Sequence, residues 1–237
     1  MDNAATRVLA ILLKTKEANE DASCLTVWKY ALETEDDIAV LGKIGKFLVQ
    51  SNQAAEDIKR HFPNQSDSAT YWQNQILVGM QNTSLSQRWA HFTVYIDNHV
   101  INYLQAHSAL LSAVHGNPKL SSDSLSNLER LLNESLGEIR NSTLTSKTKL
   151  ILSKKIIETI ESINDYKILG FEEVFDNLTS LAGNIAFLPN EEKLVLKENS
   201  AYEKITSAVK IGLEAYECAE KVASIMQDLP KLIGNMP

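Results

Sequence analysis

Apolar residues recur every three or four positions along almost the whole chain, in stretches that four internal prolines separate. This spacing is typical of amphipathic α-helices, and proline marks their boundaries because it lacks a backbone N–H group. The prolines are Pro63, Pro118, Pro189 and Pro230. No Asn-Gly or Asp-Gly turn joins two alternating runs, so no strand is predicted. The sequence therefore predicts an all-α protein, a helical bundle of about eight or nine helices.

Capping residues and helix breakers predict where the helices begin and end. The expected helices are 3–17, 35–61, 66–82, 84–114, 122–140, 145–165, 171–187 and 201–227, with a short element at 23–32 and a further segment that starts at Pro189. Ser66 or Asp67 is expected to cap the helix over 66–82. The run His115-Gly116-Asn117-Pro118 is the clearest stop in the chain. It predicts two parts, an N-terminal helical bundle over 1–117 and a C-terminal helical part over 118–237.

Two helices carry apolar seams that are narrow enough to indicate packing against another helix. In 35–61 the predicted seam is Ile38, Leu41, Gly45, Leu48, Asn52, Ala55 and Phe62, and Gly42 with Gly45 would admit a close neighbour or mark a bend. In 201–227 it is Tyr202, Ile205, Val209, Gly212, Tyr216, Ala219, Ala223 and Met226. The pattern leaves open whether the second seam packs within the chain or against another copy.

Composition excludes several classes of protein. The chain has 237 residues, 44% hydrophobic and 22% charged, which predicts a folded globular protein rather than a disordered one. Its formal net charge of −7 is spread over both halves, and the densest basic cluster is Lys147, Lys149, Lys154 and Lys155, so nucleic-acid binding is not expected. Two isolated cysteines, no signal peptide and no apolar span predict a cytoplasmic protein.

The histidines do not form a predicted metal site. His91, His99, His107 and His115 are eight residues apart, which on a helix corresponds to about 12 Å and a rotation of about 80°. Successive imidazoles therefore share no face, whereas chelation on one helix needs residues four apart. Two of these histidines are expected at the edge of the core and two in solvent. No metal or other cofactor is predicted.

An alternative is an enzyme built on Arg88, His91 and His99. Arg88 and His91 resemble the Arg/His pair of helical ribonucleases of the HEPN type. That motif separates its residues by four to six positions, whereas here the gap is two residues. Polar side chains beside an aromatic stripe are more often a helix edge than a catalytic site. We therefore expect no enzymatic activity, with a divergent HEPN-like ribonuclease as the alternative.

A second resemblance covers residues 144–188. This stretch has a capped helix that ends in Ile163-Asn164-Asp165-Tyr166, then Leu169-Gly170-Phe171, and a second helix that closes with Leu181-Ala182-Gly183. It resembles segments of uncharacterised all-helical bacterial proteins, some of them encoded beside toxin or antiphage-defence genes. The resemblance implies no catalytic residues and favours a role in such a system.

The leading hypothesis is a non-enzymatic helical protein-interaction module, an accessory or regulatory subunit of a bacterial complex of the defence or toxin-immunity type. Aromatic and large apolar side chains usually provide most of the affinity in such contacts. The predicted contact residues are Trp28, Tyr30, Tyr202, Tyr216 and Met226. The partner would be another protein, a second copy of the chain, or both. A membrane-acting helical effector is a further alternative, which the lack of a basic amphipathic face disfavours.

Overall fold

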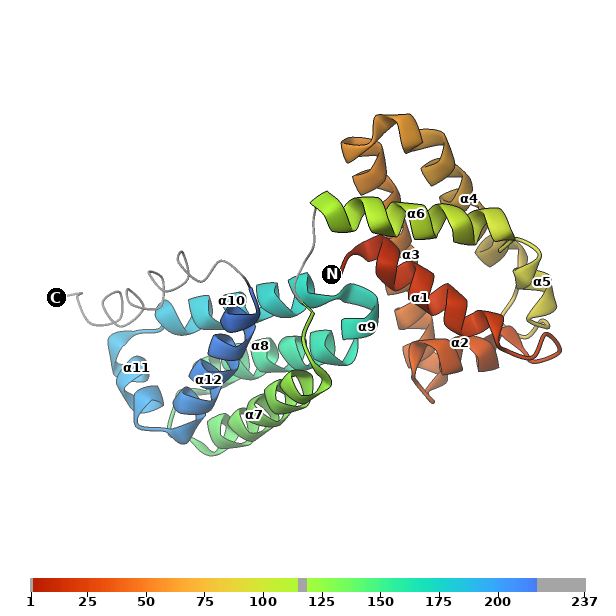
Figure 1. The fold of residues 1–237 in the computed structure, drawn as a ribbon. Coiled ribbons are helices and arrows are strands. Elements are labelled where there is room, and N and C mark those ends of the chain that lie inside the picture. Colours follow the sequence, from red (N-terminus) through yellow and green to blue (C-terminus); the bar gives the residue numbers. More distant parts are fainter. Residues whose placement is uncertain (1, 115–118, 217–237) are drawn as a thin grey trace. The chain divides into compact units, whose positions relative to one another are not determined.

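The structure is a computed structural model that describes residues 2–114 and 119–216. These residues form twelve α-helices and one 3₁₀ turn and contain no strand, which confirms the all-α prediction (Figure 1). The chain divides into two compact units. Unit 1 comprises Met1–Asn117 together with Lys167–Gly170, and unit 2 comprises Pro118–Tyr166 and Phe171–Pro237.

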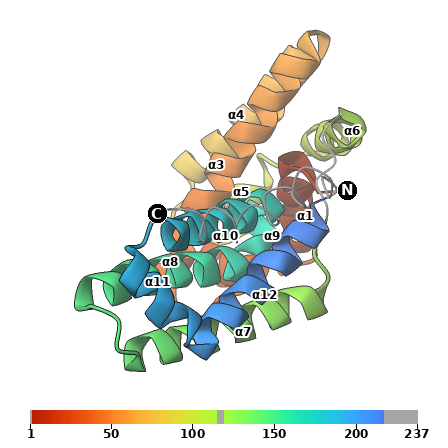
Figure 2. The same ribbon diagram turned by 90° about the vertical axis from the view of Figure 1, so that its left-hand side faces the viewer.

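Unit 1 is built on a set of helices from the first half of the chain. They are α1 (Ala4–Lys16), α2 (Cys24–Leu32), α3 (Asp37–His61), the 3₁₀ turn η1 (Pro63–Gln65), α4 (Ser66–Asn82), α5 (Ala90–Thr93) and α6 (Asn98–Val114). Helix α1 packs against α2, α3 and α6, and α4 packs against α3 and α6. Helices α3 and α4 run side by side as a long hairpin that turns at η1 (Figure 2). The side chains of Asn3, Ser23 and Asp36 cap α1, α2 and α3.

Unit 2 is a bundle of four long helices with one shorter connecting helix. They are α7 (Ser122–Asn141), α8 (Ser146–Asn164), α10 (Phe171–Ala186), α11 (Asn190–Lys197) and α12 (Ser200–Ala215). Helices α8 and α12 each contact both α7 and α10. The short helix α9 (Tyr166–Leu169) crosses the boundary between the units in sequence. Ile205, Val209 and Gly212 are buried, so the described part of the C-terminal seam packs within this chain.

The predicted helix over 84–114 is wrong, because its first part pairs with a distant loop instead. The backbone N–H of Cys24 donates to the carbonyl of Gln87 at 2.8 Å, and that of Trp89 donates to Ala22 at 2.8 Å. These bonds hold residues 84–89 in an irregular conformation before α5 begins. Asp97 then caps α6 by accepting from the Val100 N–H at 2.9 Å. Such breaks give more helices in the described residues than the eight or nine predicted.

The capping prediction for α4 is also wrong. Neither Ser66 nor Asp67 precedes the helix, since η1 leads directly into it and Gln65 occupies the N-cap without a side-chain hydrogen bond. Pro63 begins η1, where its missing N–H has no consequence. The proline therefore starts a helical turn as well as ending α3.

The predicted buried seam of α3 is largely wrong. The buried residues of α3 are Val40, Ile44, Phe47, Ser51, Ala54, Ala55 and Ile58, whereas Ile38 and Leu41 are exposed. Both sets recur every three or four positions, so periodicity fits either face. The helices that pack against α3 decide between them.

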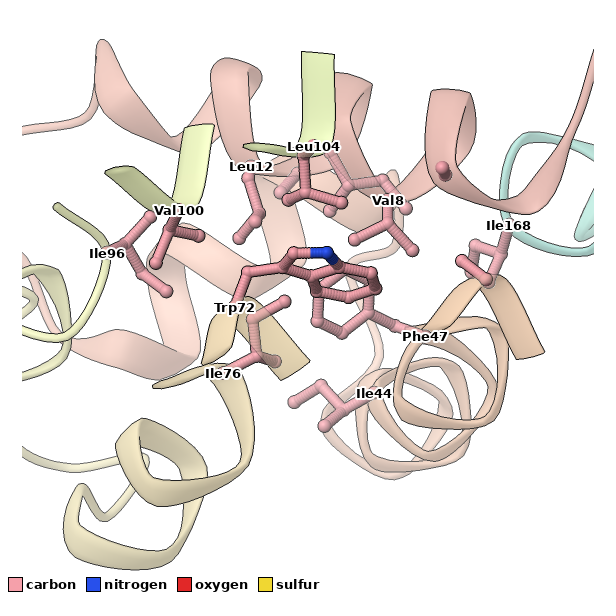
Figure 3. Close-up of a cluster of buried hydrophobic side chains, with 14 of the residues drawn as sticks. Val8, Leu12, Ile44, Phe47, Trp72, Ile76, Ile96, Val100, Leu104 and Ile168 are labelled. Atoms are coloured by element: carbon pink, nitrogen blue, oxygen red, sulfur yellow. The ribbon is translucent and has the colours of Figure 1, made fainter. Parts of the chain in front are cut away.

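Trp72 lies in the middle of the unit 1 core, among Val8, Phe47 and Leu104 (Figure 3). Its indole Nε1 donates to Nδ1 of the fully buried His107 at 3.0 Å. The Nε2 atom of His107 lies 3.1 Å from Ser68 Oγ, and that hydroxyl donates to the Gln65 carbonyl at 2.8 Å. Since Nδ1 accepts, Nε2 carries the proton, and His107 is a neutral core residue.

A second aromatic group surrounds Trp28. The Trp28 ring lies 5.5 Å from Trp89 and 5.4 Å from Phe92 in edge-to-face geometry, and 5.3 Å from Phe47. These contacts join α2, α3 and α5. Edge-to-face pairs add to the free energy of burial because the positive ring edge meets the negative face. Trp89 differs from Trp72 in one respect, since its buried Nε1 has no hydrogen-bond partner among the described residues.

Arg7 is the main buried charge of unit 1. Its Nη1 lies 2.8 Å from Asp2 Oδ2, its Nη2 donates to Gln50 Oε1 at 2.7 Å, and its Nε donates to the Ile168 carbonyl at 3.0 Å. The peptide segment Lys167–Gly170 thereby belongs to unit 1 although it is far away in sequence. Gly170 has φ of +79°, and an added Cβ would lie 2.2 Å from Arg7 Nη1.

We predict that Gly170→Ala destabilises the protein by about 2–4 kcal/mol, because the side chain is strained at positive φ and collides with Arg7. The matched control is Gly42→Ala, in the same unit. An added Cβ at Gly42 meets nothing within 4 Å, so alanine should raise stability by about 0.5–1 kcal/mol through helix propensity. Urea unfolding of the two variants measures the difference, and equal effects would contradict the role given to Gly170.

We predict that Trp72→Phe lowers the free energy of unfolding more than Trp89→Phe does, and that the difference between the two losses is about 1–2 kcal/mol. Both substitutions remove the same indole volume from a buried site. Only Trp72→Phe also leaves the His107 Nδ1 acceptor without its donor. Chemical denaturation followed by circular dichroism compares the two variants, and a larger loss for Trp89→Phe would contradict the assignment.

We predict that lowering the pH below about 6.5 destabilises the protein in part through His107. Burial lowers the pKa of His107 from its ordinary value of 6.5. In that range the unfolded chain binds the proton more readily than the folded one, so stability falls as the pH falls. The variant His107→Gln keeps an acceptor for Trp72 and a donor for Ser68 but cannot titrate. Between pH 6.5 and 5 its free energy of unfolding should therefore fall less than that of the wild type, and the difference between the two losses should be at most about 2 kcal/mol. Equal pH profiles of unfolding would refute this.

Candidate interaction surfaces

The predicted contact residues of unit 1 lie in different environments. Trp28 is 1% exposed and belongs to the core, so it offers no surface to a partner, because α2 turns this face toward α3 and α5. Tyr30 is exposed on the same helix, with the Lys14 ammonium 4.9 Å from the centre of its ring. Lys14 also pairs with Glu33 at 2.8 Å. Tyr30 is therefore a surface residue that already has a cationic neighbour.

The predicted contact residues of unit 2 lie at the edge of its core. Tyr216 is half-buried and stacks on Phe175, with the ring centres 4.7 Å apart and the planes inclined by 11°. Tyr202 is also half-buried and packs against the same hydrophobic core. Both aromatic rings therefore contribute to the bundle itself. Met226 lies outside the described residues.

The residues of the ribonuclease alternative are all exposed. The His91 N–H donates to the Arg88 carbonyl at 3.0 Å, but in the described part of the chain no side-chain hydrogen bond, ion pair or ring contact joins the three residues. Arg88 lies 3.4 Å from Asp21 in a solvent-exposed ion pair. His91 is on α5, and the His99 ring lies 6.3 Å from that of Tyr103 on α6. The structure thus exposes Arg88, His91 and His99 without bringing their side chains together into a site.

Asp97, which lies between His91 and His99 in the sequence, has a structural role. Its carboxylate accepts from Tyr71 Oη at 2.7 Å and from the Val100 N–H. Partial burial acts to raise the pKa of Asp97, but these hydrogen bonds and nearby His99 outweigh it and lower the pKa. The same contact raises the pKa of Tyr71. Asp97 therefore stays ionised as a helix cap, and it is poorly suited to act as a general acid at neutral pH.

Metal-binding and nucleophilic groups are equally dispersed. Across residues 2–114 and 119–216, no three side chains of His, Cys, Asp or Glu lie close enough together to hold a metal ion. The Cys24 thiol is buried, and burial raises its pKa, which disfavours the reactive thiolate. Cys218 lies outside the described residues.

An apolar surface that prediction placed in the core is instead exposed on α3. We call it the α3 face, defined by Ile38, Leu41, Gly42, Gly45 and Val49. Ile38 is 80% exposed, Leu41 55% and Val49 64%. A Cβ added to either glycine would meet nothing within 4 Å. Ile38, Leu41 and Gly45 of this surface belong to the seam that the sequence predicts.

A second exposed face lies on α8. We call it the α8 face, with Leu150 and Ile157 at its centre, 71% and 37% exposed. They border a shallow hollow of about 720 Å³ whose lining includes Arg140, Lys154 and Glu161. The basic cluster of the sequence falls here: Lys149 donates to the Arg140 carbonyl, and Lys155 pairs with Glu158 at 2.7 Å. Three of the four lysines of the cluster, Lys149, Lys154 and Lys155, thus have partners within unit 2.

None of the helices in the described ranges combines the length and apolarity that crossing a bilayer requires. No protein-family model, curated protein or solved structure gives a significant match to this chain.

Proposed function

We propose that this chain is a non-enzymatic protein-interaction module that binds a helix of a partner protein through the α3 face. The observation that carries the proposal is the exposure of Ile38, Leu41 and Val49 along one side of a single helix, beside two glycines with open space around them. Scattered exposed apolar residues are ordinary, whereas a contiguous row typically marks a binding surface.

The α3 face suits a helical partner in its dimensions and its energetics. Ile38 and Val49 are eleven residues apart, which on a helix is about 16 Å, or three turns. Covering each of the three aliphatic side chains fully would contribute on the order of 1.5–3 kcal/mol. At Gly42 and Gly45 a large side chain of the partner can approach the α3 backbone directly. This arrangement corresponds to a helix that lays its apolar side along α3.

Charge near the ends of the α3 face bears on the partner. Asp36 caps the N-terminus of α3, Glu35 precedes it, and both are exposed. At the other end Glu56 is exposed but pairs with Lys59 at 2.9 Å, so its charge is offset. The partner helix should therefore be apolar in the middle and basic at the end that meets Glu35 and Asp36.

An accessory or regulatory subunit of a bacterial complex would use such a face, and the resemblance of 144–188 to helical proteins of toxin or defence loci favours a complex of that type. The exposed and separate positions of Arg88, His91 and His99 favour binding over a ribonuclease mechanism, which needs its groups within hydrogen-bond reach of one substrate.

We predict that Val49→Glu weakens partner binding at least tenfold, because it places a charge inside an apolar contact. The matched control is Val94→Glu, the same substitution in the same unit at a site that is 73% exposed. Both side chains point to solvent, so both variants should fold. A photo-crosslinking residue at Ile38 would first identify the partner in the source organism, and titration of the purified partner would then compare the three proteins.

Equal binding by the wild type and both variants would overturn the assignment of the α3 face. The enzyme alternative has a separate readout. RNA cleavage by the purified chain that is lost in a folded His91→Ala/His99→Ala variant would replace the proposal by a ribonuclease.

A further inference from the structure

We propose that the α8 face is a self-association surface, on which α8 packs antiparallel against α8 of a second copy of this chain. The sequence positions along this face are Ser146, Leu150, Ser153 and Ile157, with alternating spacings of four and three. Such spacing keeps one side of a helix against one neighbouring helix. In the described chain the opposite side of α8 contacts α7 and α10, and this side is left to solvent.

The face is self-complementary in shape when the two-fold axis passes between Ser153 and Lys154. Leu150 of each copy then lies opposite Ile157 of the other. Ser153 and Lys154 lie next to the axis, and Lys154 pairs with Glu158 of its own helix at 3.8 Å, which offsets the repulsion between the two lysines. Leu150 of each copy would enter the shallow hollow of the other copy, which Leu150 and Ile157 of that copy border. In a two-fold symmetric contact every interaction occurs twice, so the dimer buries two leucine–isoleucine pairs.

The charges at the two ends of the face are also self-complementary. Arg140 and Lys147 are exposed at the N-terminal end of α8, and Glu161 is exposed at its C-terminal end. None of these three side chains forms an ion pair with another residue in the described ranges. Lys147 and Glu161 lie about 10 Å and 11 Å from the proposed axis on opposite sides, given the helical rise. Antiparallel packing therefore brings Lys147 of each copy beside Glu161 of the other.

Opposite charges at the two ends of one face are what a second copy in antiparallel orientation complements. The occupant of the α8 face is thus a second copy rather than a different protein. A single helix pair is smaller than the standard interface of about 1,600 Å², so the dimer should be weak and reversible, with an affinity in the micromolar range.

Sedimentation of the full-length chain over a range of concentrations tests this inference. We predict that the wild type dimerises, and that Lys147→Glu and Glu161→Lys each raise the dissociation constant about tenfold by opposing like charges. In the variant that carries both substitutions, residue 147 is acidic and residue 161 is basic, so each cross-dimer pair again joins opposite charges. Its dissociation constant should return to within about threefold of the wild-type value, the remainder reflecting Arg140, which stays basic. Leu150→Asp should abolish dimerisation.

Val49→Glu on the α3 face is the control, and it should leave dimerisation unchanged while it weakens partner binding. A wild-type chain that stays monomeric at every concentration overturns the inference. So does a dimer that Leu150→Asp leaves intact, or one that the two single charge reversals weaken and the double reversal fails to restore. Circular dichroism of each variant establishes that a loss of association is not a loss of folding.

Discussion

The guanidinium group of Arg7 is the interaction on which the organisation of unit 1 depends. A buried cation is tolerated only when hydrogen bonds and an opposite charge replace its lost hydration. Arg7 obtains these from Asp2, from Gln50 on α3 and from the Ile168 carbonyl. Three parts of the chain that are far apart in sequence are therefore held to one side chain. The glycine at position 170 follows from the same requirement, because a Cβ there would occupy the space of the guanidinium.

Glu33 contacts the same segment through Lys167. Its carboxylate pairs with Lys14 on α1 and with Lys167, and these two lysines, Lys14 first, lower its pKa. These pairs are exposed, so they contribute less free energy than the Arg7 group. Together they explain why Lys167–Gly170 belongs to unit 1 although the residues on both sides of it belong to unit 2.

Polar side chains of types that often act in catalysis have structural roles in this protein. His107 accepts from Trp72 in the core, Asp97 caps α6, and Cys24 is buried. Two helix faces stand out on the surface. In the proposals made above, the α3 face binds a helix of a partner protein, and the α8 face, with opposite charges at its ends, binds a second copy.

The sequence by itself determined the helical class, since period and caps are local: Asn3, Ser23 and Thr145 each accept a hydrogen bond from a backbone N–H three residues on. Only the tertiary structure decided which face of each helix is buried. The seam through Ile38 and Leu41 has the same period as the buried row through Ile44 and Phe47, and only packing against other helices separates them. Likewise the break before α5 requires hydrogen bonds to residues more than sixty positions away. Periodicity is a property of one segment, whereas burial and long-range pairing depend on what the rest of the chain places beside it.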